Sequence, residues 1–292
     1  MISQLNLTEQ VNAVTEALTQ DIKNNKLDLP SPPELLMELR RLGADPDSTT
    51  NDIADLVKHD VNISGRLIKI ANCALFASRN KVSTVQAAMT RLGLKKVQSL
   101  VTGLVIGKQI MRNKTKGLEA FCQQVWQTSN DVAALSYIIA QKKTKLDPEQ
   151  ALLAGIVHNI GALPLVLKLN TIQVLKDDPK IMTMVADVFI PKLYPKAGQL
   201  IMQSWHFSPE IIVVAREHLN IQRTGTQQLE LADIALLAHH LNQMTDIKED
   251  IIPEALISSP AFKKCWADWP TAVSELLTLG EEIKQMKSDM AG

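Results

Sequence analysis

The stretch LVKHDVNISGRLIKIANCALFA, residues 56–77, decides the fold class of this chain. Asp60 is a residue type that caps helices, and Ile63, Leu67 and Ile70 follow it at intervals of three to four residues. This spacing places the three apolar side chains on one face of a helix, whereas a strand would alternate apolar and polar residues. The stretch therefore predicts an amphipathic helix that packs against a core.

The same helical period extends from this stretch toward both ends of the chain. No alternating apolar pattern and no Asn-Gly or Asp-Gly hairpin turn interrupts it, so we expect an all-α fold, a multi-helix bundle. Thr49 with Asp52 resembles a capping box, as do Ser31 with Glu34 and Ser83 with Gln86. The helices predicted with both ends cover 6–23, 94–109, 118–141, 148–160 and 228–243. Further helices are predicted to begin after Ser31, Thr49, Asp60 and Ser83, at Ser208, and at Pro270.

The composition excludes several classes of protein. Of 292 residues, 46% are hydrophobic, which excludes intrinsic disorder, and the 31 basic and 31 acidic residues cancel, which argues against general nucleic-acid binding. The three cysteines form no CxxC pair, which is typical of a reducing compartment. The N-terminus lacks the pattern of a signal peptide, and no apolar run reaches the roughly 20 residues of a membrane span. We expect a cytoplasmic protein that does not enter a membrane.

Three motifs in fixed order carry a resemblance to a known family. They are LPSPPELLMEL at 29–39, the stretch at 56–77, and VSTVQAAMTRLGLKKVQSLV at 82–101. Together they resemble the HDOD family, bacterial signalling relatives of the HD metal-dependent phosphohydrolases. The resemblance implies an HD-like all-α bundle. It predicts an N-terminal flanking helix over 1–26, an HDOD-like domain of two sub-bundles over 27–245 with a joint near 112–117, and a C-terminal flanking helix over 246–292.

The resemblance also implies where a phosphohydrolase would hold its metal, and this chain departs from that pattern. An HD enzyme has an adjacent His-Asp pair, and LLAGIVHNIGALPL supplies His158 followed by Asn159. Thr128, or a close neighbour, stands where an upstream histidine is expected, and His239 stands near the place of a distal aspartate. An amide is a weaker ligand than a carboxylate and does not offset the charge of a cation. We therefore expect these four residues to be the remnant of a site, with no catalytic residue, metal or cofactor.

One alternative to this reading stays open. The histidines outside the His-Asn pair could build a different site, although neighbours on a helix point about 100° apart and seldom share one ion. These histidines are His206, His218, His239 and His240.

The expected function is that of a non-catalytic signal-transduction module that binds a signalling protein or a small anionic ligand. The alternative is a metal-dependent phosphohydrolase acting on a nucleotide or another phosphate ester. A nucleic-acid adaptor is disfavoured by the neutral charge. The sequence carries no signal for a particular oligomeric state.

Seven cations without an acidic residue among them are the candidate partner-binding residues. The simpler interpretation is a solvated basic face. The sharper one is a recognition surface for an acidic segment or an anionic ligand, since such a patch speeds and orients encounter. The residues are Arg66, Lys69, Arg79, Lys81, Arg91, Lys95 and Lys96.

Overall fold

The computed structural model describes residues 7–24, 26–73, 76, 80–244 and 254–291. All regular elements within these ranges are α-helices, so the predicted all-α class is confirmed. In chain order the helices are α1 Leu7–Lys23, α2 Glu34–Ala44, α3 Thr50–Lys58, α4 Val61–Ala71, α5 Val85–Leu92, α6 Leu94–Arg112, α7 Glu119–Lys143, α8 Pro148–Val157, α9 Ala162–Leu169, α10 Gln173–Asp177, α11 Pro179–Val188, α12 Ile190–Ser204, α13 Pro209–Glu217, α14 Leu231–Asn242, α15 Glu254–Ser258, α16 Pro260–Cys265, α17 Trp269–Thr278 and α18 Gly280–Ala291.

Several predicted helix starts are confirmed by their caps. The Thr49 side chain accepts from the backbone N–H of Asp52, whose carboxylate accepts from Thr49 in return, which completes a capping box. Asp60 caps α4 by accepting from the backbone N–H groups of Asn62 and Ile63. Each cap satisfies backbone donors that the first helical turn leaves unpaired.

Two predicted starts were displaced along the chain. Helix α2 begins at Glu34 with Pro33 as its N-cap residue, and not after a capping Ser31. A residue before proline avoids the helical region, so the consecutive prolines keep the chain extended up to Pro33. Helix α5 is capped by Thr84, which accepts from the N–H of Ala87, and not by Ser83.

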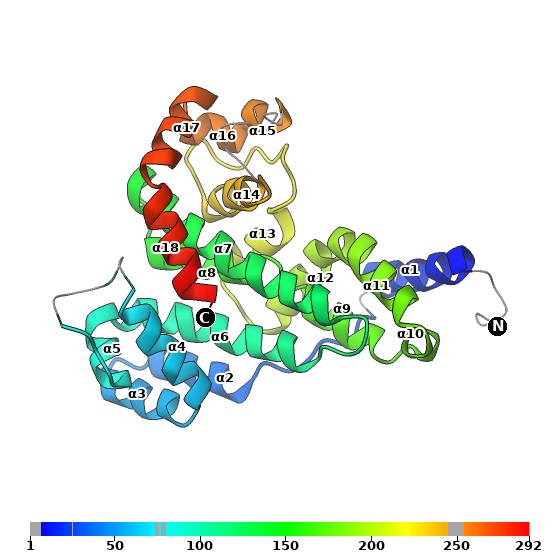
Figure 1. Cartoon of the computed structure of the whole chain (residues 1–292), viewed down its shortest axis with the longest axis horizontal. Helices are drawn as coiled ribbons and strands as arrows, with labels where there is room; N and C mark the ends of the chain where they lie inside the picture. Colours follow the sequence, from blue (N-terminus) through cyan, green and yellow to red (C-terminus); the bar gives the residue numbers. More distant parts are fainter. Residues whose placement is uncertain (1–6, 25, 74–75, 77–79, 245–253, 292) are drawn as a thin grey trace.

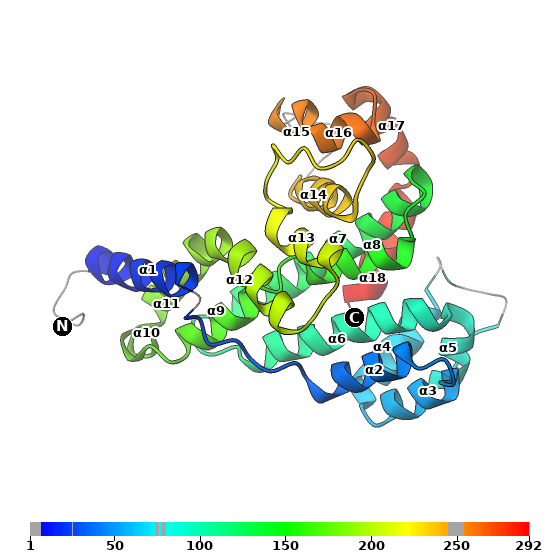
Figure 2. The same cartoon turned by 180° about the vertical axis from the view of Figure 1, so that it is seen from behind.

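Helix α6 is the boundary between two groups of helices (Figures 1 and 2). Helices α2, α4 and α5 pack against it on one side, and α3 packs on α2, α4 and α5. On its other side α6 contacts α7, α8 and α9. Gly93, which joins α5 to α6, has φ +80°, a conformation that glycine adopts without strain. The predicted joint near 112–117 falls in the connection from α6 to α7, and the division into two sub-bundles stays a prediction.

Helix α7 runs through the centre of the second group. It packs against α8 most extensively, and also against α6, α14 and α18. Helices α8, α12 and α14 all pack on α13, so the ends of α8, α13 and α14 approach one another beside α7. This arrangement positions the site described below.

The C-terminal segment differs from the single helix predicted from Pro270. The structure has two helices there, with α17 ending at Thr278 and α18 beginning at Gly280. Glycine is a poor helix former, which explains the break. Helix α18 packs back on α7 and touches α4. Helices α15 and α16, before this segment, were not predicted.

One helical stretch of the described chain is long and apolar enough to suit a membrane span. It is Pro148–Leu169, which comprises α8, the turn after it, and α9. However, 83% of its most apolar window is buried inside the fold. The stretch is therefore a core segment here, and the cytoplasmic location stays a prediction.

Candidate metal centre

Three histidines from three different helices meet in the core beside α7. His158 follows the last residue of α8, His218 follows the last residue of α13, and His239 lies within α14. One ring nitrogen of each lies within 4.8 Å of the corresponding nitrogens of the other two. The side chains are buried, with relative exposures of 0%, 0% and 3%. We call these three residues the histidine trio.

Close contact between helices brings His158 to this position. A Cβ on Gly155 would lie 2.4 Å from the Cα of Ala133 in α7, so only glycine lets α8 approach α7 this closely. After the turn, a Cβ on Gly161 would lie 1.9 Å from the carbonyl oxygen of Tyr194 in α12. The chain on both sides of His158 is therefore fixed by backbone-to-backbone contact.

Backbone carbonyls set which ring nitrogen of the trio carries a proton. Nδ1 of His158 lies 2.6 Å from the carbonyl oxygen of Gly155, and Nδ1 of His218 lies 3.0 Å from that of Ala215. A carbonyl only accepts, so each Nδ1 donates and each Nε2 carries a lone pair. Nε2 of His218 is buried and has no hydrogen-bond partner among the described residues. Such an orphaned acceptor is rare in a protein interior.

The third histidine completes a consistent proton arrangement. Nδ1 of His239 lies 3.3 Å from Nε2 of His158 and donates to it. The amide nitrogen of Gln243 donates to Nε2 of His239 at 3.0 Å. If the Gln243 amide turns over, its oxygen accepts from Nε2 instead, and Nδ1 of His239 becomes a free lone pair.

The pKa values of all three imidazoles fall far below the ordinary value. Burial, and then the charge of His218, lowers the pKa of His158 to about 3. Burial and His239 lower the pKa of His218 to about 3, and burial and His158 lower that of His239 to about 2. The rings are therefore neutral at pH 7, the form in which imidazole binds a metal.

The four residues expected as the remnant of a hydrolase site lie close together. Thr128, Asn159 and His239 line one cavity of about 510 Å³, and His158 is hydrogen-bonded to His239. Asn159 is engaged on both amide atoms: its Nδ2 donates to the Val125 carbonyl at 3.0 Å, and its Oδ1 accepts from the Ser129 hydroxyl at 2.7 Å.

These four residues do not fit the hydrolase type of metal site. Asn159 and Thr128 supply no negative charge, and both amide atoms of Asn159 are already used in hydrogen bonds. The histidine trio is a different set of ligands, which the sequence left open. It fits a single zinc-like ion, because three neutral imidazoles with carbonyl-fixed tautomers form a typical zinc ligand set. Adjacent nitrogens around tetrahedral zinc are about 3.3 Å apart at ordinary bond lengths. His158 and His239 have this spacing, and the three nitrogens together lie within 4.8 Å of one another.

A bound ion of this kind would supply Lewis-acid chemistry. His158 and His218 would offer Nε2, and His239 would offer Nδ1. The ring of Tyr194 is stacked on that of His218, with 5.4 Å between the ring centroids and 5° between the ring planes.

Zinc titration is expected to raise the melting temperature of the wild-type protein and to leave that of His218→Ala unchanged. An ion at a hundredfold excess over its Kd stabilises the folded state by about 2.7 kcal/mol. His218→Ala removes one of three ligands and the orphaned Nε2. Differential scanning fluorimetry with zinc measures both shifts.

His240→Ala is the matched control. His240 neighbours His239, but its Nδ1 donates to the Leu236 carbonyl at 2.9 Å and it is not part of the trio. It should respond to zinc like the wild type. Equal shifts in wild type and His218→Ala would mean that the trio is a hydrogen-bonded cluster and that zinc binds elsewhere.

The remaining histidines named from the sequence, His206 and His240, are not members of the trio. His206 lines a different cavity, between α2, α6 and the start of α13. The ring centroid of His240 lies 5.5 Å from that of His239, but its nitrogen serves the α14 backbone.

Two of the seven candidate partner-binding cations, Arg91 and Lys96, each make several contacts inside the fold. Arg91 donates to the Ala71 carbonyl at 3.0 Å and to Asn72 Oδ1 at 3.1 Å, so it ties the end of α4 to α5. Lys96 pairs with Glu149 at 3.2 Å and lies over the rings of Phe76 and Tyr137.

The other five cations are in varied surroundings. Lys95 lies 3.7 Å from Asp147. Arg66 lies over the Trp126 ring at 5.2 Å, beside a different cavity. Lys69 and Lys81 are exposed. Arg79 lies outside the described residues.

Sequence reasoning missed three residues that complete the site: Ser129, Tyr194 and Gln243. Ser129 is the close neighbour of Thr128 that bonds Asn159. A serine one position after the expected histidine was a signal that it could take this role. Tyr194 and Gln243 come from α12 and from the end of α14, and nothing in their local sequence connects them to His218 or His239.

Comparison with known proteins gives consistent matches. The family model described as HDOD domain matches residues 29–221. A crystal structure from Shewanella amazonensis SB2B, named "Putative metal-dependent phosphohydrolase", has a TM-score of 0.71 at 22% identity, covering 96% of this chain and 99% of that one. An HDOD domain protein with unknown function from Geobacter sulfurreducens has a TM-score of 0.67 at 18% identity, covering 95% and 98%. At these identities the likeness concerns the fold alone.

A curated relative is longer than this chain. An uncharacterized protein of Treponema pallidum (strain Nichols) is 24% identical over 265 residues, which are 85% of this chain and 49% of that protein. The chain thus spans about half the length of the curated relative it matches.

Proposed function

Because this chain belongs to the HDOD domain family, we propose that it is a signal-transduction module that binds a protein partner or a small ligand and does not hydrolyse phosphate esters. The observation that carries the proposal is the engagement of Asn159. Its amide bridges α7 and the turn after α8 through Ser129 and Val125, where a hydrolase needs a carboxylate. A structure named for a signal transduction protein, from Marinobacter aquaeolei VT8, shares the fold with a TM-score of 0.58 at 19% identity.

The charge of the site supports this proposal. Hydrolysis of a phosphate ester by this class of metal site requires carboxylates that hold the cation and offset its charge. Thr128 and Asn159 are neutral, and Asn159 is 3% exposed with both amide atoms paired. The hydrogen bonds between Asn159 and α7 support a structural role, in which Asn159 fixes the end of α8 to α7.

A second candidate function is favoured by the histidine trio. Three neutral imidazoles within 4.8 Å of one another are a ligand set for one transition-metal ion. A metal-dependent phosphohydrolase built on this trio would act on a nucleotide or another phosphate ester.

The assay that separates the two functions uses bis(p-nitrophenyl) phosphate with Mg²⁺, Mn²⁺, Ni²⁺ or Zn²⁺ added in turn. We expect no hydrolysis above the metal-only blank, from the wild type or from Asn159→Asp. The single carboxylate would face the Val125 carbonyl, which accepts from the amide in the wild type, and Thr128 would still supply no imidazole.

Two outcomes would contradict the proposal. Metal-dependent turnover by the wild type that disappears in His158→Ala would establish the second candidate. Turnover by folded Asn159→Asp would show that one carboxylate is enough. Circular dichroism of each variant provides the control for folding.

The exposed cations are the proposed surface for a protein partner. Lys69 on α4 and Lys81 before α5 are exposed, which supports this role. Arg91 and Lys96 are committed to contacts inside the fold, so their contribution would be structural.

A further inference from the structure

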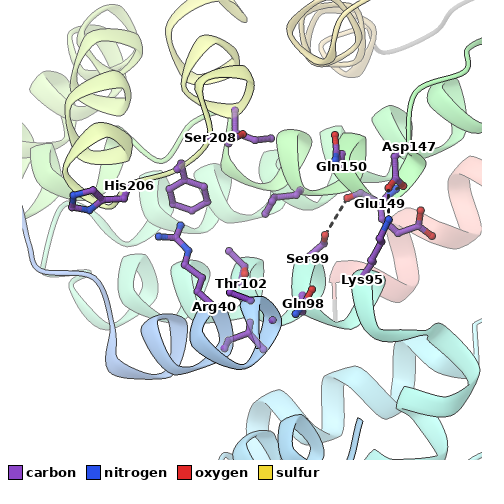
Figure 3. Close-up of a pocket in the computed structure, with 16 residues that line it drawn as sticks. Arg40, Lys95, Gln98, Ser99, Thr102, Asp147, Glu149, Gln150, His206 and Ser208 are labelled. Carbon is purple, nitrogen blue, oxygen red and sulfur yellow. Dashed lines mark hydrogen bonds and ion pairs between the residues drawn. The ribbon is translucent and has the colours of Figure 1, made fainter. Parts of the chain in front are cut away.

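A second cavity, distinct from the trio, lies between α2, α6, the first turn of α8 and the loop before α13. Its volume is about 460 Å³, within the range of small-ligand sites. Figure 3 shows Arg40 rising from α2 toward the loop that carries His206, with Thr102 beside it on α6.

Arg40 is the unusual residue of this cavity. Its Nη1 donates to the carbonyl oxygen of Trp205, and its Cζ lies 4.0 Å from the centroid of the Phe207 ring. Its Nη2 is buried and has no hydrogen-bond partner in the part of the chain that the structure describes. Burial also lowers the pKa of this guanidinium. A buried, charged donor without a partner costs free energy, so the arrangement calls for an acceptor.

The carboxylates of the cavity wall do not supply that acceptor. Asp147 lies 3.7 Å from Lys95, and Glu149 lies 3.2 Å from Lys96. No carboxylate of the described residues forms an ion pair with Arg40. Since the two acidic groups are balanced by lysines, Arg40 leaves its end of the cavity with a positive charge.

The rest of the wall suits an organic molecule better than a bare ion. Leu39, Leu153 and Ile211 contribute apolar surface from three helices. Gln98 and Thr102 on α6 add polar groups that can donate or accept. A small polar set within an apolar wall is typical of a ligand pocket.

We propose that this cavity binds a small organic anion, whose phosphate or carboxylate pairs with Arg40 and whose apolar or planar body lies between Leu39, Leu153 and Ile211. This inference deepens the proposed function and rests on it, because it gives the chemical class of ligand that the signalling module would sense. A guanidinium donates to a phosphate oxygen and to a carboxylate oxygen alike, so the two anions share one chemistry here.

The same residues connect the cavity to the rest of the fold. Trp205, whose carbonyl accepts from Arg40, donates its indole N–H to the Pro30 carbonyl at 2.7 Å. His206, the next residue, has φ +55°, which is strained for a residue with a side chain. An anion on Arg40 would therefore act on a loop that holds the start of α13 against the chain leading into α2.

The test measures the binding of defined probes to the 292-residue chain. Isothermal titration calorimetry and thermal unfolding, both at constant ionic strength, provide the two measurements. The probes are inorganic phosphate, adenosine 5′-monophosphate and benzoate. The monophosphate and benzoate distinguish a phosphate ester from a carboxylate as the source of the anion. We expect saturable binding of at least one organic probe. Arg40→Met should weaken it about tenfold or more, because a hydrogen bond to a charged group is lost.

Arg41→Met is the matched control, since Arg41 is the next residue, exposed, and paired with Glu38 at 2.6 Å. It should bind like the wild type. If Arg40→Met does not fold, Leu153→Trp narrows the cavity from α8 while Arg40 stays in place, and it should also abolish binding.

Four outcomes would overturn the inference: no saturable binding of any organic probe, unchanged binding by folded Arg40→Met, equal binding by the wild type and Leu153→Trp, or equal weakening by Arg41→Met. None of these involves hydrolysis. A negative binding result would therefore not contradict the proposal that the protein does not hydrolyse phosphate esters. Turnover of the phosphodiester would in turn not contradict a positive binding result.

Discussion

Replacing Asp233 by alanine is expected to lower the free energy of unfolding by about 3–5 kcal/mol. Asp233 is fully buried and pairs with two cations, Arg223 and, at 3.0 Å, Lys264. It also accepts from the backbone N–H of Glu230 at 3.0 Å, which closes the capping box of α14. The substitution removes the carboxylate that pairs with Lys264 and leaves Arg223 with Glu230 alone. It also weakens the start of the helix that carries His239.

Chemical denaturation of the wild type and the variant measures this loss. Asp55→Ala is the control, because Asp55 pairs with Lys58 at 2.6 Å while its side chain is 68% exposed. Removing an exposed pair of this kind costs at most about 1 kcal/mol. If Asp233→Ala lost no more than Asp55→Ala, the buried ion cluster would not stabilise α14 as argued here.

The second large effect is expected from Gly155→Ala, which should destabilise the protein by about 2 kcal/mol or more. The added Cβ would lie 2.4 Å from the Cα of Ala133 and 2.8 Å from the carbonyl oxygen of Val132, and backbone atoms cannot yield as a flexible side chain can. Helix α8 would have to move away from α7. The carbonyl that orients His158 would move with it.

Gly65→Ala is the same substitution in another helix, α4, and it is expected to raise the stability of the protein instead of lowering it. A Cβ on Gly65 meets no atom within 4 Å, and alanine is favoured over glycine in a helix interior by about 1 kcal/mol. Thermal or urea unfolding of both variants should therefore give a difference of about 3 kcal/mol between them. Equal stabilities would show that α7 and α8 can separate without cost.

Sequence was sufficient for the fold class because helix signals are local. The Thr49 capping box and the Asp60 cap involve residues at most three positions apart, and both were predicted. The displaced start of α2 arose from competition between two local signals. Ser31 can cap a helix, but the two prolines after it hold the backbone extended and move the start to Glu34.

The candidate site was only half predictable, because its members are distant in sequence. His158 and Asn159 were recognised from their motif, and His239 from its expected place. His218 stood among the histidines left open, since its approach to His158 depends on how α13 packs against α8 and α14. No sequence pattern predicts the unpaired Nη2 of Arg40. It depends on the packing of one side chain against the Trp205 carbonyl and the Phe207 ring, which are distant in sequence.

The length of α7 has a mechanical consequence. Its 25 residues form a rod about 37 Å long. Near one end of the helix, Trp126 lies under Arg66 of α4, and farther along Ser129 donates a hydrogen bond to Asn159. At the other end, Lys143 pairs with Glu275 of α17 at 2.7 Å. Pivoting such a rod by about 5° about one end displaces the other by about 3 Å, more than the 1–2 Å helix shifts that switch subunit interfaces. Helix α7 thus has the dimensions of a lever that joins α4, Asn159 beside the histidine trio, and the C-terminal helices.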